Sequence, residues 1–275
     1  MTKAMVADAA TLLARGRNAD GGFGARIGQA SEAEPTALAA LALDDDAARA
    51  WLVQHQRADG SFAIDTGPYV NDSATTLAAL ALGPGPERER ALDHVEATRA
   101  RHVPSTDAIP IDQAAVGWAW AIGTASWVEP TARAVWALRV SRPSSTALMD
   151  GVALLRDRES AGGGWNYGNR VVLGEELPPF AQTTAIALIA MSGFDRALET
   201  RGLATLRRLW RTESAGGLSL ATALAAFRVH AANVDAKAVR VALDELVRAN
   251  GSWDDAVALG WAALATSDRM PGIAA

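Results

Sequence analysis

Three carboxyl side chains stand at the start of alanine-rich apolar runs, where they could act as proton donors. Glu34 precedes PTALAALAL, Glu129 precedes PTARAVWAL, and Asp255 precedes AVALGWAAL. A carboxyl group that its surroundings keep neutral can protonate an alkene or an epoxide by general acid catalysis. The competing interpretation is helix capping, because an acidic residue before proline accepts free backbone N–H groups and suits the helix dipole. We favour capping for Glu34, Glu129 and Asp72, whereas the two interpretations are balanced for Asp255, which no proline follows.

Aromatic and polar side chains gather in one glycine-rich stretch, GGGWNYGNRVVLGEELPP, residues 162–179. A pocket that orients a ligand with an apolar body and a polar end needs both kinds of side chain. The candidate ligand-binding residues are those of this stretch together with three tryptophans that precede it: Trp165, Asn166, Tyr167, Asn169, Arg170, Glu175, Glu176, Trp118, Trp120 and Trp127. The alternative is a loop whose Asn and Arg side chains satisfy its own backbone while the aromatic rings close one end of the fold.

The composition excludes several classes of site. The chain has no cysteine, so it can form no disulfide, thiolate zinc site or thiol nucleophile. Its four histidines lack the spacing of a helical metal pair, and we expect neither a metal ion nor a cofactor. A net charge of -5 without a lysine or arginine run argues against nucleic-acid binding. We find no signal-peptide core and no integral membrane segment, so we expect a cytoplasmic protein.

Two kinds of helix alternate along the sequence, joined by glycine turns such as NADGG and RADGS. One kind is apolar on every side and must be covered all round, whereas the other keeps a polar face for solvent. We expect the apolar helices near residues 35–43, 73–82, 130–139, 181–191, 219–229 and 254–265. The amphipathic helices are expected near residues 4–15, 46–56, 86–100, 143–157, 195–211 and 235–248. Strands have little support, because no stretch keeps a period of two between turn signals.

This alternation predicts an all-α fold, an (α/α)6 toroid or barrel of six inner and six outer helices, in a single domain of residues 1–275. Two intervals, residues 102–127 and 162–179, are longer than an ordinary helix connection. Long loops in compact domains are usually functional or disordered, and the aromatic side chains of these two make disorder a poor explanation. We therefore expect both loops to pack over one mouth of the toroid.

The turns resemble the QW-type repeat of squalene-hopene cyclases and related terpenoid cyclases. WLVQHQRADGSF, residues 51–62, has the aromatic, aliphatic, glutamine, glycine and second aromatic positions of that repeat. LLRDRESAGGGW, residues 154–165, is a second copy with Glu159 in place of the glutamine. The resemblance covers nearly the whole chain, and it implies the α/α toroid that terpenoid cyclases share with protein prenyltransferase β subunits. The aromatic after the turn can stack on a planar amide or guanidinium and so fasten adjacent helices.

The resemblance is less informative about catalysis. Class II cyclases of this family protonate their substrate with an aspartate of a D-x-D-D-T-A sequence, and aromatic walls then stabilise the carbocation. Glu34, Asp72, Glu129 and Asp255 stand at the corresponding place, and none lies in an intact D-x-D-D sequence. The catalytic zinc of the prenyltransferases needs a cysteine, which this chain lacks. Because class II cyclases form their cavity between two barrels, a second chain or a homodimer could complete a pocket.

Three functions remain open. The first is a terpenoid-cyclase-like protein that binds, and cyclises or rearranges by protonation, an isoprenoid or similar apolar substrate; it requires a deep aromatic cavity with Glu34, Glu129 or Asp255 inside. The second is a non-catalytic toroid that binds an apolar ligand or a partner protein, which requires a cavity or groove without a buried acid. The third is a carbohydrate-processing α/α barrel, which requires two opposed carboxylates in an open aromatic cleft.

Overall fold

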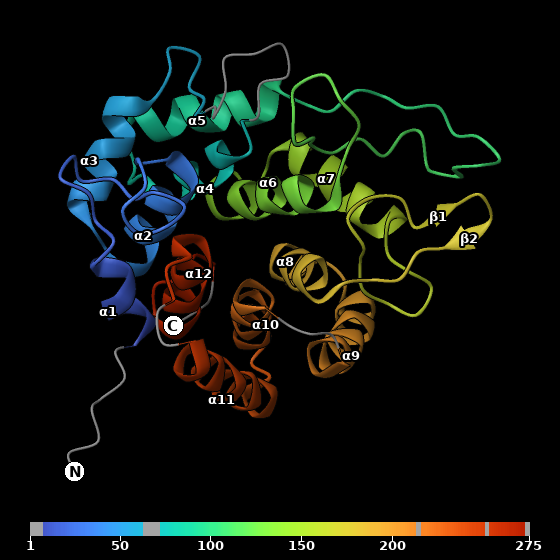
Figure 1. Ribbon diagram of the computed structural model, residues 1–275. Helices are drawn as coiled ribbons and strands as arrows, with labels where there is room; N and C mark the ends of the chain where they lie inside the picture. Colours follow the sequence, from blue (N-terminus) through green and yellow to red (C-terminus); the bar gives the residue numbers. More distant parts are fainter. Residues whose placement is uncertain (1–7, 63–71, 213–215, 251–252, 273–275) are drawn as a thin grey trace.

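The helices follow the predicted alternation closely. The computed structural model describes residues 8–62, 72–212, 216–250 and 253–272 (Figure 1). The apolar helices of these ranges are α2 (Ala33–Leu43), α4 (Ala74–Ala81), α6 (Val128–Ser141), α8 (Ala181–Met191), α10 (Gly217–Val229) and α12 (Ala256–Thr266). The amphipathic helices are α1 (Ala9–Ala14), α3 (Asp46–His55), α5 (Pro86–Ala97), α7 (Thr146–Asp157), α9 (Arg196–Thr212) and α11 (Asn233–Asn250). The described chain is therefore mostly helical, as predicted; the expected start of the first helix, near residue 4, lies outside the described residues.

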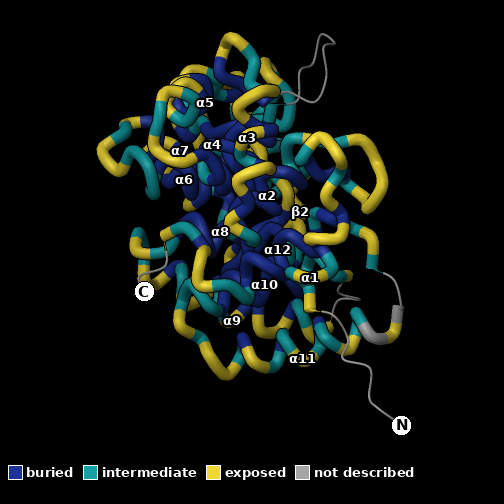
Figure 2. Tube along the Cα trace, turned by 90° about the vertical axis from the view of Figure 1, so that its left-hand side faces the viewer, coloured by how far each residue is buried: buried dark blue, intermediate teal, exposed yellow. Residues whose placement is uncertain are grey.

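The even-numbered helices are buried on every side, as their composition predicts. Every residue of α2 from Pro35 to Ala42 is buried, and so is nearly all of α8. The odd-numbered helices bury one face only: α9 buries Leu198, Leu206 and Leu209 and exposes its arginines. Figure 2 shows the buried residues concentrated in the even-numbered helices. Removal of this apolar surface from water, at roughly 25 cal/mol per Å², is the main term that favours folding.

The even-numbered helices contact one another in chain order, from α2 through α12, and α12 in turn contacts α2. Each odd-numbered helix packs on an even-numbered neighbour: α3 on α2, α5 on α4, α7 on α6, α9 on α8 and α11 on α10. Helix α1 lies against both α2 and α12, so the first and last helices of the described chain meet (Figure 1).

One hydrogen bond recurs where a glycine turn meets the next apolar helix. The backbone N–H of the aromatic residue after the turn donates to a threonine hydroxyl, from Phe23 to Thr36 (2.9 Å), Phe62 to Thr75 (3.0 Å), Trp118 to Thr131 (2.9 Å) and Trp165 to Thr184 (3.0 Å). In three of these turns a glycine faces the next amphipathic helix: Gly21 faces Ala47, Gly60 faces Arg90 and Gly163 faces Arg201. A Cβ atom on Gly60, where φ is +86°, would lie 2.2 Å from the carbonyl oxygen of Arg90 in α5, so only glycine fits. These three turns thus contact both the next apolar helix and the next amphipathic helix.

A pair of short strands in the second long loop corrects the expectation that strands have little support. The strand β1 (Val171–Val172) pairs antiparallel with β2 (Glu175–Glu176). Between them, Leu173 and Gly174 have φ of +54° and +81°, which suits the two-residue hairpin turns that match strand twist. The N–H of Leu173 donates to the carbonyl of Ala108 at 2.6 Å, so the two long loops contact each other. Two-residue strands are too short to show a period of two in the sequence.

Candidate functional site

Two of the three candidate acids come together on one arginine. The Nη2 atom of Arg133, in α6, lies 2.8 Å from Oε1 of Glu34 in α2 and 2.6 Å from Oε1 of Glu129 in α6. Because both oxygens contact the same nitrogen, they are no more than 5.4 Å apart, the sum of those two distances. Gln182 of α8 donates to the other oxygen of Glu129 at 3.2 Å. The first turns of three apolar helices thus converge on one buried polar cluster.

Arg133 is a buried cation at the centre of this cluster. The side chains of Arg133 and Glu129 are 4% and 5% exposed, and that of Glu34 is 20% exposed. Burial lowers the pKa of Arg133, but the charges of Glu34 and Glu129 and their hydrogen bonds outweigh it and raise the pKa above its usual value. The guanidinium carbon also lies 5.6 Å from the ring centroid of Trp120, within reach of a cation–π interaction. A proton donor to an alkene must be a neutral carboxyl, and a permanently charged guanidinium opposes that form.

The capping interpretation is correct for one acid and wrong for the others. The carboxylate of Asp255 caps α12, where it accepts the N–H of Ala258 at 2.9 Å. The N-cap residues of α2 and α6 are Glu32 and Trp127, and neither helix has a side-chain cap hydrogen bond, because the carboxylates of the first turn go to Arg133 instead. The N-cap residue of α4 is Ser73. The carboxylate of Asp72 contacts Nε2 of His94 at 2.7 Å.

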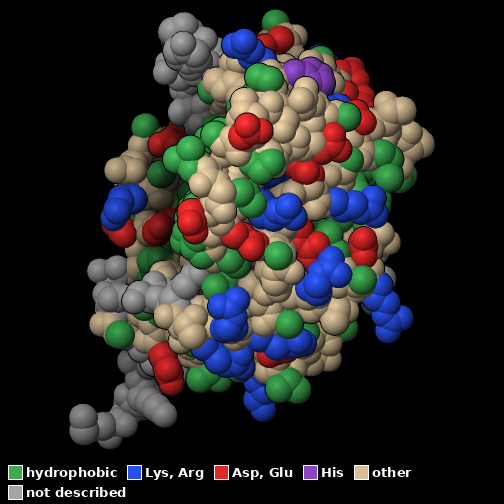
Figure 3. All heavy atoms as spheres, turned by 90° about the vertical axis from the view of Figure 1, so that its right-hand side faces the viewer, with side chains coloured by type: hydrophobic (Ala, Val, Ile, Leu, Met, Phe, Trp, Pro, Cys, Tyr) green, Lys and Arg blue, Asp and Glu red, His purple; other side chains and the backbone are tan. Residues whose placement is uncertain are grey.

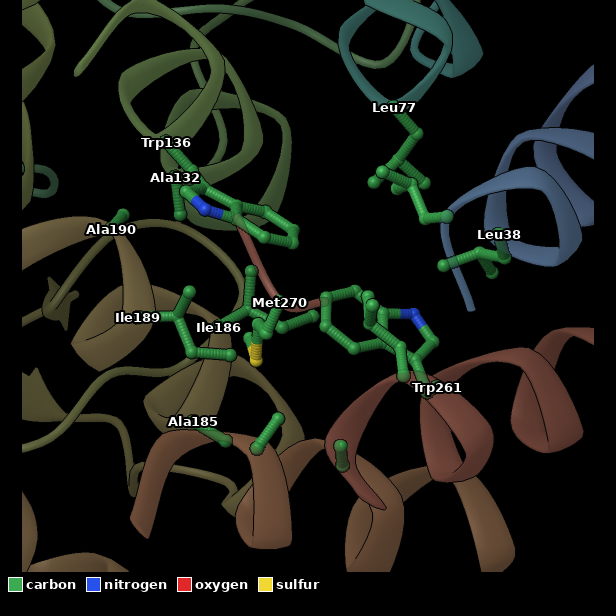
Figure 4. Packing of buried hydrophobic residues seen from close by; sticks show 14 of the residues in the cluster. Leu38, Leu77, Ala132, Trp136, Ala185, Ile186, Ile189, Ala190, Trp261 and Met270 are labelled. Atoms are coloured by element: carbon green, nitrogen blue, oxygen red, sulfur yellow. The ribbon is translucent and has the colours of Figure 1, made fainter. Parts of the chain in front are cut away.

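The space among the even-numbered helices is filled by apolar side chains (Figure 4). Trp136 of α6 stacks on Trp261 of α12 with ring centroids 5.8 Å apart, and its indole N–H donates to the carbonyl of Pro271 at 2.9 Å. Met270, from the segment after α12, lies with Ile186 of α8 beside these rings. The two tryptophans and Ile186 are at most 1% exposed, so there is no room for a ligand next to them.

Two candidate lining residues, Trp118 and Trp165, have structural positions. They are 5% and 0% exposed, and their indole N–H groups donate to the carbonyls of Val95 and Leu155, both at 2.7 Å. The guanidinium of Arg99 lies 4.4 Å from the Trp118 ring, the type of stacking expected of the repeat. These rings join each turn to the preceding amphipathic helix and leave no face free for a ligand.

The polar loop after Trp165 largely satisfies itself, as the alternative interpretation requires. The buried side chain of Asn166 donates to the carbonyl of Asn169 at 2.9 Å and accepts the N–H of Gly168 at 2.8 Å. Tyr167 packs on Phe180 with ring centroids 4.9 Å apart. A carboxylate oxygen of Glu176 accepts the N–H of Ala161 at 2.6 Å. Arg170 and Glu175 are exposed.

A pocket of about 90 Å³ lies between the two long loops and brings two of the candidate ligand-binding residues together. Its lining includes Trp127 and Asn169, the apolar Val103 and Ile111, and the charged Arg101, Asp112 and Arg158. Trp127 is 40% exposed, so one face of its ring is available to a ligand. Tyr167, Arg170, Glu175 and Glu176 do not line it.

Arg158 is the residue of this pocket that sequence analysis missed. It is 4% exposed, and its Nε atom has no hydrogen-bond partner among the described residues. Burial lowers its pKa, and the charges of Asp157, which it contacts, and Asp112 oppose that shift. Buried polar groups are nearly always paired, so the free N–H is a group that a ligand could satisfy. The sequence could have indicated a buried partner for Arg133, since an arginine inside an otherwise apolar run is costly to bury unpaired. No pattern in the sequence distinguishes Arg158 from the exposed arginines.

Within the described ranges, no group of three or more acidic or histidine side chains could hold a metal ion. None of the helices there combines the length and apolar character needed to cross a membrane. No family model matches the chain, and no curated protein sequence matches it. The likeness to terpenoid cyclases therefore stays a prediction from the repeats alone.

Proposed function

We propose that this chain is a non-catalytic α/α toroid that binds a small molecule with an apolar body and a polar end in the pocket between its two long loops. The closed succession of contacts among the even-numbered helices, covered by the odd-numbered ones, supports the toroid. The glycine turns and their aromatic–threonine hydrogen bonds, which repeat at corresponding places, support it further.

The absence of catalysis is supported by the state of the candidate acids. Glu34 and Glu129 both pair with the guanidinium of Arg133, and Asp255 is a helix cap. A cyclase would need one neutral carboxyl beside an aromatic cavity, and tightly packed tryptophans occupy the space among the helices. The two glutamates are close enough for a pair of glycosidase carboxylates, but the arginine stands between them where a sugar would have to bind.

The observation that carries the binding proposal is the meeting of an exposed tryptophan face with a buried, partly unpaired arginine in one pocket. Trp127, Val103 and Ile111 supply the apolar wall, and Arg158 supplies a planar guanidinium suited to a carboxylate. At about 90 Å³ the pocket is smaller than the roughly 300–1,000 Å³ of typical small-molecule sites, so it takes the polar end of the ligand only. The rest of the ligand then lies along the exposed ring of Trp127.

Isothermal titration calorimetry with farnesoic acid, farnesol and dodecanoate tests this proposal. We expect the two acids to bind more tightly than the alcohol, and Trp127→Ala to weaken all three by about tenfold, since a large aromatic contact is lost. Arg158→Met, which removes the guanidinium proposed to bind the carboxylate, should weaken the two acids more than the alcohol. Met149→Ala, which removes an apolar side chain that is 50% exposed on α7, is the matched control. Equal binding by Trp127→Ala and the unaltered protein would refute the pocket, and turnover of squalene or geranylgeraniol that Glu129→Gln abolishes would refute the non-catalytic assignment.

A further inference from the structure

The outward face of α9 is rich in arginine, although the whole protein is acidic. The other exposed residues between Arg196 and Arg211 are alanine or threonine. Five arginines of this helix are exposed: Arg196, Arg201, Arg207, Arg208 and Arg211. The net charge of the chain is -5. Figure 3 shows arginine and lysine side chains gathered on the lower part of the face to which α9 belongs. A cationic face on an anionic protein favours an anionic partner.

Neighbouring acids neutralise only part of this face. Glu159 pairs with Arg201 at 2.7 Å, and Asp235 lies near both Arg207 (2.7 Å) and Arg211 (3.9 Å), so one carboxylate serves two cations. These carboxylates are 11% and 14% exposed, whereas the three arginines are 44–49% exposed, so the positive groups point outward. The side chains of Arg196 and Arg208 have no ion-pair partner among the described residues. Five arginines against these two carboxylates leave an excess of three positive charges, which Glu199 of α9 and Asp195 just before the helix reduce but do not cancel.

A pocket of about 270 Å³ adjoins this face at Arg208. Its apolar walls come from the segment before α8, with Leu177, Pro178 and Pro179, and from the glycine turn at Gly162. Glu176 also lines it, and one of its carboxylate oxygens accepts the N–H of Ala161 at 2.6 Å. Ser160 also lines it, and this residue is 4% exposed with a hydroxyl group that has no hydrogen-bond partner among the described residues. Apolar walls with one unpaired hydroxyl fit a single apolar side chain and the backbone beside it.

We propose that the α9 arginine face and this pocket together bind an acidic segment of a partner protein, which inserts one apolar side chain into the pocket while its carboxylates pair with the arginines. Arg208 lies on the α9 arginine face and also lines the pocket, so the pocket and the arginines form one continuous surface. The inference concerns a different surface from the ligand pocket between the long loops and does not depend on it.

The shape and composition of the surface favour a peptide over other polyanions. A membrane surface would need projecting apolar side chains, and none of the large exposed ones lies on α9. Single-stranded nucleic acid would need free aromatic rings for stacking. The aromatic residue of α9, Trp210, is half-buried and has the guanidinium of Arg211 4.4 Å from its ring centroid. An apolar pocket beside exposed arginines matches an acidic peptide that carries one apolar side chain.

Fluorescence anisotropy with a labelled Glu- and Asp-rich peptide that carries one central phenylalanine tests the proposal. The matched peptide has serine in place of phenylalanine. We expect the phenylalanine peptide to bind more tightly, and its affinity to fall as NaCl rises from about 50 to about 200 mM, since exposed charges are screened. Arg208→Glu should weaken both peptides by about tenfold or more. Arg15→Glu, a reversal at another exposed arginine, should change neither.

Gly162→Leu tests the contribution of the pocket to binding independently of the contribution of the arginines. Gly162 lines the pocket, and a Cβ atom there meets nothing within 4 Å, so a leucine at this position takes up pocket space without a clash at its Cβ atom. We expect this variant to bind the phenylalanine peptide no better than the serine peptide. Equal binding of the two peptides by the unaltered protein, or equal binding by Arg208→Glu and the unaltered protein, would overturn the proposal. So would tighter binding to phosphatidylglycerol vesicles or to single-stranded DNA than to the phenylalanine peptide.

Discussion

Replacement of Arg133 by methionine leaves two carboxylates without their shared cation. The side chain of Glu129 is 5% exposed and cannot recover its charge stabilisation from water, and loss of one partner from a buried ion pair costs about 3–5 kcal/mol. We expect the lower end, about 3 kcal/mol, because Glu34 is 20% exposed and Glu129 keeps its hydrogen bond from Gln182. Methionine has a similar length to the arginine stem, so the loss reflects charge more than volume.

Urea denaturation at pH 7 measures this loss of unfolding free energy. The dependence of that free energy on urea concentration, the m-value, should be the same in the variant and the unaltered protein. Arg142→Met is the matched control, since Arg142 contacts three carboxylates, at 2.8, 2.7 and 2.5 Å, that are 59%, 70% and 30% exposed. That change should cost less than about 1 kcal/mol, as surface ion pairs do. Equal losses in the two variants would refute a stabilising role for the buried ion-pair cluster.

Three further expectations concern the turns and the histidine contact, each measured by urea denaturation. Gly60→Ala should cost at least about 2 kcal/mol more than Gly28→Ala, since both have φ of +86° but only Gly60 meets a backbone carbonyl at 2.2 Å, and similar losses would contradict this. Thr131→Val should cost about 1–3 kcal/mol, because a buried backbone N–H loses its acceptor; a neutral effect would remove the energetic role of the recurring hydrogen bond. Burial lowers the pKa of His94, but its hydrogen bond and charge interaction with Asp72 prevail and raise the pKa above 6.5. The resulting stabilisation is full below about pH 6.5 and is lost as pH rises through the folded value, so His94→Gln should destabilise more at about pH 6 than at about pH 9, and the reverse order would contradict it.

The positions of the helices were largely predictable from sequence, because a helix that is buried on every side has no polar residues on any face. The run PTALAALAL, which begins at Pro35, has no polar face, and every residue from Pro35 to Ala42 is buried. The amphipathic helix α9, which packs on α8, was equally predictable, since its apolar residues Leu198, Leu206 and Leu209 share one face. The two-residue strands β1 and β2 were missed because their pairing depends on the Leu173 and Gly174 backbone, which no period reveals.

The candidate site was less predictable because its chemistry depends on contacts between distant residues. Glu34 and Arg133 are far apart in the sequence, and an acid that opens a helix has the same local pattern whether it caps, pairs or donates a proton. Tryptophan is equally ambiguous: Trp165 is buried in the core, whereas Trp127 keeps 40% of its surface exposed beside a pocket. Residue type limited the possible roles, and packing selected among them.

Native mass spectrometry of the chain purified from its own host, under conditions gentle enough to keep ligands bound, shows whether the pocket between the two long loops holds a ligand. We expect a small organic adduct on the unaltered protein that is reduced or lost in Trp127→Ala and retained in Met149→Ala. A chain that carries no adduct in any form, or an adduct that Trp127→Ala retains in full, would contradict a ligand pocket between the two long loops.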